Sequence, residues 1–250
     1  MDAANPPTHV PPASAGARRE LKTRHTRWAA ALATWLARTG VSPNAISVAS
    51  VAFASVSGIC YAETVRDRAP WADAVLLLAA AACMQLRLLC NMLDGMVAVE
   101  WGRASRAGEI FNDLPDRLAD TIIFCGAGYA AGGQYGPTLG WAAAVVSLLT
   151  AYLRVLGRSV GAGTYFIGPM AKQHRMALLT GATLVAAAVV RRGWSHPILT
   201  AALAIIVLGA LITCVRRLRR ILGDLKHPEA EASEVRRDAS TAPRAEAPRP

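Results

Sequence analysis

The sequence is poor in charged and in aromatic side chains for its size. Of its 250 residues only 18% are charged and 6% aromatic, whereas 53% are apolar. A soluble domain of this length rarely combines so much apolar composition with so little charge. The charged residues also collect at both ends and in two loops, which leaves long stretches almost uncharged. This pattern predicts a protein that crosses the membrane several times.

Other absences exclude further classes of function. The five cysteines form no C-x-x-C pair and lie in or beside apolar stretches, so we assign them no redox or metal role. The first 20 residues contain no apolar core, so no secretory signal is predicted. The net charge of +10 is spread over loops and ends rather than over one basic face. Membrane lipids with anionic headgroups are therefore the expected partners, and nucleic acid is not.

Composition divides the chain into three regions. Residues 1–18 are rich in Pro and Ala, residues 223–250 mix Arg, Glu, Ala and Pro, and both are predicted to be disordered tails. Residues 19–222 form one membrane domain. It opens with an amphipathic helix over 19–38, which is predicted to lie in the headgroup region and to end at Gly40. Binding of a cytosolic partner is the alternative role for that helix.

Six apolar stretches predict an all-α, polytopic fold with six transmembrane helices. A helix needs about 20 residues to cross the hydrocarbon core of ~30 Å. The first begins with Ser42 as its N-cap and Pro43 at its first position. The predicted spans are 44–62, 72–98, 112–132, 139–156, 172–190 and 197–215. Basic residues are concentrated in alternate loops, which places both termini and the 91–120 segment on the cytoplasmic side of a bacterial inner membrane.

Acidic and amide side chains recur at helical spacing within this membrane-like sequence. Asn91 and Asp94 fall on one stripe of a helix, and Asn112, Asp116 and Asp120 fall on one stripe of the next. Carboxylates at membrane depth are costly, so they normally face a cavity, a partner or a metal. These two helices are therefore predicted to carry the functional site.

The spacing of this segment resembles the signature of the CDP-alcohol phosphatidyltransferases, D-x2-D-G-x2-A-R-x8-G-x3-D-x3-D. The segment from Gly40 to Asn44 also resembles the G-x-x-P-N sequence that precedes the first helix in that family. The resemblance covers roughly residues 20–220. The residues that match the signature are Asp94, Gly95, Ala98, Gly108 and Asp116.

The resemblance implies an enzyme that transfers a phosphatidyl group from CDP-diacylglycerol, or a similar CDP-alcohol, to an acceptor hydroxyl and releases CMP. It implies that Asp94 and Asp116 are catalytic, with Asp116 as the base toward the acceptor. It also implies Mg²⁺ or Mn²⁺ against the donor pyrophosphate, which suits the chemistry of oxygen ligands. Gly95, Ala98 and Gly108 would line the nucleotide site, and a homodimer is the implied assembly.

The sequence departs from the family pattern at three positions. Asn91 and Asn112 stand where the signature has aspartates, and Val99 stands at the position of its arginine. Asparagine oxygens are neutral and weaker ligands for a hard cation. Asp113, next to Asn112, is the expected substitute. The predicted metal ligands are thus Asn91, Asp94, Asn112, Asp113 and Asp116. A homologue that binds a nucleotide-lipid or a cation without turnover stays open, as does a small transporter.

Four basic residues are candidate contacts for the acceptor or for a phosphate, namely Arg87, Arg103, Lys172 and Arg175. Each has a structural alternative. Arg87 is equally suited to an internal ion pair, because an arginine at membrane depth needs a partner. Lys172 and Arg175 precede an apolar span and are equally suited to lipid headgroups. The acceptor alcohol itself is not identified by the sequence.

Overall fold

The computed structural model describes residues 27–66, 69–100 and 106–226, and all the regular structure within these ranges is helical. The two predicted tails lie outside the described residues, apart from 223–226, and so do residues 19–26 of the amphipathic segment. The predicted all-α class is confirmed. The helices are α1 (Arg27–Arg38), α2 (Pro43–Glu63), α3 (Pro70–Glu100), α4 (Arg106–Ala131), α5 (Gly136–Ser159), α6 (Lys172–Val189) and α7 (Ser195–Lys226), with a short 3₁₀ turn η3 (Val190–Arg192) before α7.

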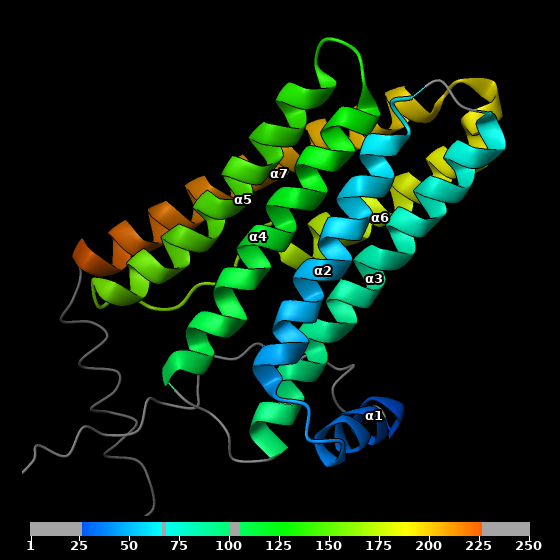
Figure 1. The fold of residues 1–250 in the computed structure, drawn as a ribbon. Coiled ribbons are helices and arrows are strands. Elements are labelled where there is room, and N and C mark those ends of the chain that lie inside the picture. Colours follow the sequence, from blue (N-terminus) through cyan, green and yellow to red (C-terminus); the bar gives the residue numbers. More distant parts are fainter. Residues whose placement is uncertain (1–26, 67–68, 101–105, 227–250) are drawn as a thin grey trace, which may run out of the picture.

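The six long helices run up and down in one bundle, and α1 lies across one end of it (Figure 1). Helix α4 is central, because it packs against α2, α5 and α7. Consecutive helices alternate in direction, so the start of α2, the end of α3 and the start of α4 meet at the end of the bundle near α1. The 91–120 segment predicted to be functional therefore lies at this end.

Local sequence explains how α1 and α2 are joined. The Ser42 hydroxyl accepts a hydrogen bond from the Ala45 amide at 3.2 Å, and Pro43 follows at the first helical position, as predicted. Gly40 turns the chain between the helices with a φ of 78°, a conformation that costs glycine little. This connection directs α2 away from α1 and into the bundle.

Helix α1 contacts the protein through alanines rather than through its large apolar side chains. Ala29, Ala33 and Ala37 are buried in a cluster with residues from the end of α3, whereas Trp28 and Trp35 stay more than half exposed. Exposed tryptophans are typical of the membrane–water interface. The small residues thus dock the helix on α3 and leave the indoles for the headgroup region, which agrees with an interfacial helix.

Within the part of the chain that the structure describes, five of the six long helices are long and apolar enough to cross a membrane, and α4 does not meet this criterion. Its first half carries charged side chains, including Asp116, Arg117 and Asp120, which lower its mean hydropathy. The helix also begins earlier than the predicted span and continues through Pro115. The protein is a polytopic membrane protein, and the count of six crossings stays a prediction.

Two of the helix crossings in the described bundle depend on glycine. A Cβ atom added at Gly140 of α5 would lie 2.6 Å from the Phe124 carbonyl oxygen and 2.7 Å from Gly128 Cα of α4. Neither contact is relieved by moving a side chain, because both atoms belong to backbone. A similar approach joins Gly58 of α2 to Gly126 of α4.

We expect Gly140→Ala to lower the free energy of unfolding by about 1–3 kcal/mol, because α4 and α5 must separate to admit the methyl group. Thermal unfolding of the protein in detergent measures this loss. Gly181→Ala on α6 is the matched control, since a Cβ there meets nothing within 4 Å. The interpretation is wrong if the two alanine variants unfold at the same temperature.

Candidate active site

Asp94 on α3 is buried beside the start of α2, with only 4% of its surface exposed. The hydroxyl of Ser47 donates a hydrogen bond of 2.6 Å to its Oδ2 atom. Its other oxygen, Oδ1, is buried and has no hydrogen-bond partner among the described residues. A carboxylate oxygen in this position is costly unless a ligand satisfies it. Asp94 is therefore poised to bind something that the chain itself does not supply.

Asp116 on α4 accepts hydrogen bonds at both carboxylate oxygens. Its Oδ1 accepts from Arg87 Nη2 at 3.1 Å and from the side-chain amide of Asn91, both on α3. Its Oδ2 accepts from the ammonium group of Lys172, the first residue of α6. Three side chains from two other helices thus hold this carboxylate in one orientation.

Asp120 lies one turn further along α4 and is bound by arginines. Arg87 Nη2 is 2.5 Å from Asp120 Oδ1, and Arg175 Nη2 is 3.7 Å from Asp120 Oδ2. The side chain of Arg87 is fully buried, and that of Arg175 nearly so. The predicted stripe of Asp116 and Asp120 is thus present, but Arg87 forms the internal ion pair rather than facing open space. Charges removed from water need such partners.

A cavity of about 160 Å³ opens beside this network. It lies among α4, α5, α6, α7 and the connection between α5 and α6. Arg154 forms one wall, with its guanidinium carbon 5.9 Å from the centre of the Phe166 ring. The cationic side chains that line it are Arg117, Arg154, Lys172, Arg175 and Arg217. So many guanidinium and ammonium groups around one small space favour an anionic occupant.

Backbone carbonyls hold Arg217 in this cavity wall. Its Nη1 donates to the Thr150 carbonyl at 2.6 Å and its Nε to the Ile167 carbonyl at 3.2 Å. In the sequence, Arg154 and Arg217 stand among the basic residues near the ends of predicted spans, and their charge alone does not set them apart. A signal for Arg217 was present, because it continues the buried stripe of Ala210 and Cys214 at helical spacing.

The connection between α5 and α6 is fixed across the cavity by bonds to α7. The Met170 amide donates to Thr213 Oγ1 at 3.1 Å, and the Tyr165 hydroxyl donates to the carboxylate of Asp224. The latter hydrogen bond raises the pKa of Tyr165 above its usual range, because the carboxylate of Asp224 favours the protonated phenol. This segment therefore forms a fixed wall that carries Phe166.

The other predicted site residues are placed as follows. Gly95 and Ala98 lie on α3 within about one turn of Asp94, and Gly108 and Asn112 lie on α4. Asp113 faces the basic cavity, where Arg117 Nη2 and Arg154 Nη2 each lie 2.8 Å from its Oδ1. Its role as a metal ligand stays a prediction. Arg103 falls outside the described residues.

The donor set fits one divalent cation better than a larger metal cluster. Among the described residues no three Asp, Glu, His or Cys side chains come together as ligands. The unpartnered buried oxygen of Asp94 fits a cation such as Mg²⁺ or Mn²⁺. Asp116 does not offer a second position, since both its oxygens already accept hydrogen bonds.

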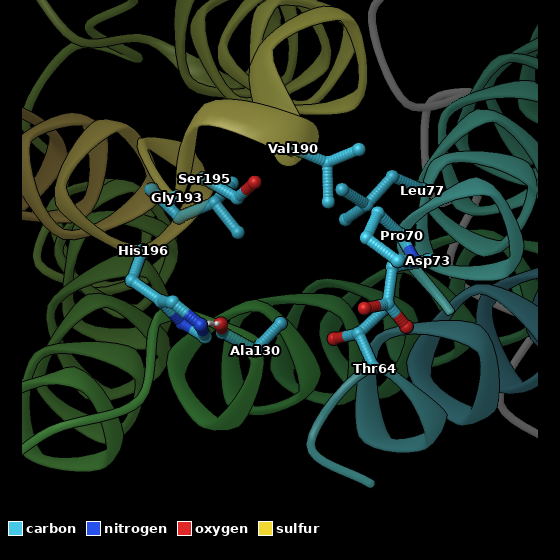
Figure 2. A pocket seen from close by; sticks show the side chains of 10 residues that line it. Thr64, Pro70, Asp73, Leu77, Ala130, Val190, Gly193, Ser195 and His196 are labelled. Atoms are coloured by element: carbon cyan, nitrogen blue, oxygen red, sulfur yellow. Dashed lines mark hydrogen bonds between the residues drawn. The ribbon is translucent and has the colours of Figure 1, made fainter. Parts of the chain in front are cut away.

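A second cavity of about 110 Å³ lies at the opposite end of the bundle (Figure 2). Thr64 and Asp73 face His196 and Ser195 across it. The His196 ring bonds the carbonyl of Ala130 at 2.9 Å. None of the residues predicted for the functional site lines this cavity, so the candidate active site lies at the α1 end.

The fold resembles that of a solved membrane enzyme. It matches the crystal structure of phosphatidylinositol phosphate synthase (PgsA1) from Mycobacterium tuberculosis in complex with manganese and citrate, with a TM-score of 0.63 and 20% identity over 78% of this chain and 88% of that one. The same enzyme with CDP-DAG bound gives a TM-score of 0.63 and 22% identity over 78% of this chain and 94% of that one. The chain thus shares the fold of this Mycobacterium tuberculosis enzyme.

Sequence comparison finds relatives along most of the chain. No family model matches the chain. A phosphatidylinositol phosphate synthase of Streptomyces avermitilis is 26% identical over 226 residues, which cover 86% of this chain and 85% of that protein. The inner membrane protein YnbA of Escherichia coli is 25% identical over 188 residues, 75% of this chain and 88% of that protein. The predicted resemblance is confirmed, because the chain is similar over most of its length to phosphatidylinositol phosphate synthases.

Proposed function

We propose that the protein transfers a phosphatidyl group from CDP-diacylglycerol, or a similar CDP-alcohol, to an acceptor hydroxyl and releases CMP in phospholipid biosynthesis. The observation that carries this proposal is that Lys172, which binds the buried carboxylate of Asp116, also lines a cationic cavity at one end of the bundle. The named activity of the Streptomyces avermitilis relative and the CDP-DAG bound by the Mycobacterium tuberculosis enzyme support it.

In the proposed reaction the acceptor oxygen bonds to the phosphorus that carries the lipid, and the pyrophosphate P–O bond breaks. CMP leaves with the electron pair, and the hydroxyl proton passes to Asp116. Arg87 and Asn91 orient that carboxylate through its Oδ1. Asp94 would hold Mg²⁺ or Mn²⁺ through its unpartnered oxygen. When bound, this cation neutralises charge on the pyrophosphate.

The acceptor is proposed to carry a phosphate of its own. Neutral acceptors need no cluster of cations, whereas phosphate oxygens are bound well by arginine and lysine. Within the described residues, Arg154 and Arg117 share the single carboxylate of Asp113, and Arg217 bonds only carbonyl groups. The cavity therefore keeps an excess of positive charge, which an acceptor such as inositol phosphate or glycerol phosphate would balance.

We expect Arg154→Gln to raise the KM for a phosphorylated acceptor by about 10–100-fold, because a hydrogen bond to a charged group contributes roughly 1.5–3 kcal/mol. The KM for CDP-diacylglycerol should stay unchanged. CMP release measured with glycerol phosphate, inositol phosphate, serine and free inositol tests this. Arg158→Gln, one turn along α5 at an exposed position, is the control. Equal turnover of phosphorylated and free acceptors would contradict a phosphate site.

We propose the membrane orientation that the distribution of basic residues among the loops predicts. The protein is a multi-pass membrane protein, and we place both termini and the active site on the cytoplasmic side of a bacterial inner membrane. The cationic residues at the end of α7, including Arg216, Arg219 and Arg220, support this placement. The Escherichia coli relative is described as an inner membrane protein. A homodimer stays a prediction from the family resemblance.

The second candidate function is binding without turnover. The neutral asparagines at positions 91 and 112 favour it, and so do the hydrogen bonds from Asn91 and Lys172, which keep both oxygens of Asp116 engaged. It predicts thermal stabilisation by CDP-diacylglycerol without CMP release. The same preparation assayed for both quantities separates the two functions.

A further inference from the structure

The charges around Asp116 are balanced by the chain itself. Within the described residues, the three acidic side chains buried at this end are Asp94, Asp116 and Asp120, and the basic side chains bound to the last two are Arg87, Lys172 and Arg175. In the family signature two further aspartates would add negative charge here, but Asn91 and Asn112 are neutral. A cluster of buried charges is tolerated when it is internally neutral.

Lys172 occupies a particular place in this cluster. Its ammonium group contacts Asp116 Oδ2, and its side chain also lines the basic cavity, with 28% of its surface exposed. The group thus sits between the proposed base and the space proposed for the acceptor. On the other oxygen of Asp116, Asn91 presents its amide hydrogens rather than its carbonyl. A divalent cation at Asp116 would meet two positive groups and an N–H donor.

Asp94, unlike Asp116, has no cationic side chain bonded to it among the described residues. Its Oδ2 accepts a hydrogen bond from Ser47, and its Oδ1 is buried without a side-chain hydrogen-bond partner among the described residues. A divalent cation therefore finds a free anionic oxygen at Asp94 and a fully engaged carboxylate at Asp116.

We propose that Lys172 takes the place of a metal ion at Asp116, so that this protein binds one divalent cation, at Asp94, and meets the remaining pyrophosphate charge with the Lys172 ammonium. The catalytic part of this inference rests on the proposed function. The metal-binding part stands on the contacts of Asp116 and Asp94 alone. Asn91 and Lys172 act together, because the asparagine lacks the charge that a second cation needs and the lysine supplies the charge it would bring.

The test is the number and affinity of Mn²⁺ ions bound by the full-length protein in detergent, measured by electron paramagnetic resonance and calorimetry. We expect one Mn²⁺ per chain, and none in Asp94→Asn. The double variant Asn91→Asp/Lys172→Gln should bind a second Mn²⁺. Two ions in the unmodified protein, or one ion in the double variant, would overturn the proposal.

Single variants keep the test decisive if the double variant does not fold. Lys172→Gln should bind Mn²⁺ at least tenfold more tightly, since it removes a positive charge from the site, and Lys172→Arg should bind it as the unmodified protein does. Unchanged affinity in Lys172→Gln would overturn the proposal. Lys226→Gln, at an exposed position at the far end of α7, is the control for loss of a lysine charge. Because Mn²⁺ binding is measured without turnover, absent CMP release rejects the proposed function separately.

Discussion

Replacing Asp116 by asparagine is expected to reduce CMP release by about a thousandfold, within the 10²–10⁴ range of general-base catalysis. Asparagine keeps the shape of the side chain but cannot accept the acceptor proton. The hydrogen bond from Lys172 can persist to the amide oxygen, whereas the new NH2 group faces the donors Arg87 and Asn91, so stability is measured alongside activity. Steady-state assays with CDP-diacylglycerol and a phosphorylated acceptor measure the loss, which should fall on kcat rather than on the donor KM.

The matched control for this experiment is Glu63→Gln. Glu63 is a carboxylate at the end of α2, on the opposite side of the bundle from the site, where it pairs with exposed Arg66 at 3.2 Å. Its replacement removes the same charge without touching the proposed chemistry. Thermal unfolding of both variants separates lost function from lost structure. Activity within tenfold of the unmodified protein in a folded Asp116→Asn variant would contradict its role as the base.

Replacing Arg87 by methionine is expected to lower the free energy of unfolding by about 3–5 kcal/mol, the cost of breaking a buried ion pair at one partner. Arg87 is fully buried and binds both Asp116 and Asp120. Methionine fills similar space but leaves the two carboxylates short of a cation. Denaturant or thermal unfolding in detergent measures the loss. The double variant Arg87→Met/Asp120→Leu should recover part of it, because both ends of one pair are then removed.

Arg66→Met is the comparison for this second prediction. Arg66 also pairs with a carboxylate, but its side chain is 70% exposed, and such pairs contribute less than about 1 kcal/mol. Equal losses of stability in Arg87→Met and Arg66→Met would contradict the prediction. The ion pairs of Arg87 would then not hold α3, α4 and α6 together.

Much of the fold was predictable because it depends on local sequence. The apolar runs are long enough for spanning helices, and Ser42 with Pro43 marks the start of α2. Helix α4 was predicted less well. The span was predicted to start at residue 112, whereas the helix begins at Arg106, so residues 106–111 were left out of it. Packing between other helices keeps this segment helical although its own composition does not favour a membrane helix.

The sequence motif predicted which residues form the site, but it did not predict which side chains they contact. Spacing placed Asp94 and Asp116 on facing helices, which is a short-range property of each helix. The partners of Asp116 come from residue 87 and residue 172, which are far apart in sequence, so no periodicity indicates which of them it binds. Arg154 and Arg217 were likewise indistinguishable from lipid-facing charges, since their burial in the cavity wall depends on how α5 packs against α7.

The most direct test of the central claim is to measure CMP and the new phospholipid together, using purified protein, CDP-diacylglycerol, Mg²⁺ or Mn²⁺ and inositol phosphate or glycerol phosphate. Phosphatidyl transfer predicts equal amounts of the two products, formed only when the acceptor is present and lost in Asp116→Asn. Thermal stabilisation by CDP-diacylglycerol with no CMP and no new lipid would contradict the account and identify a binding protein.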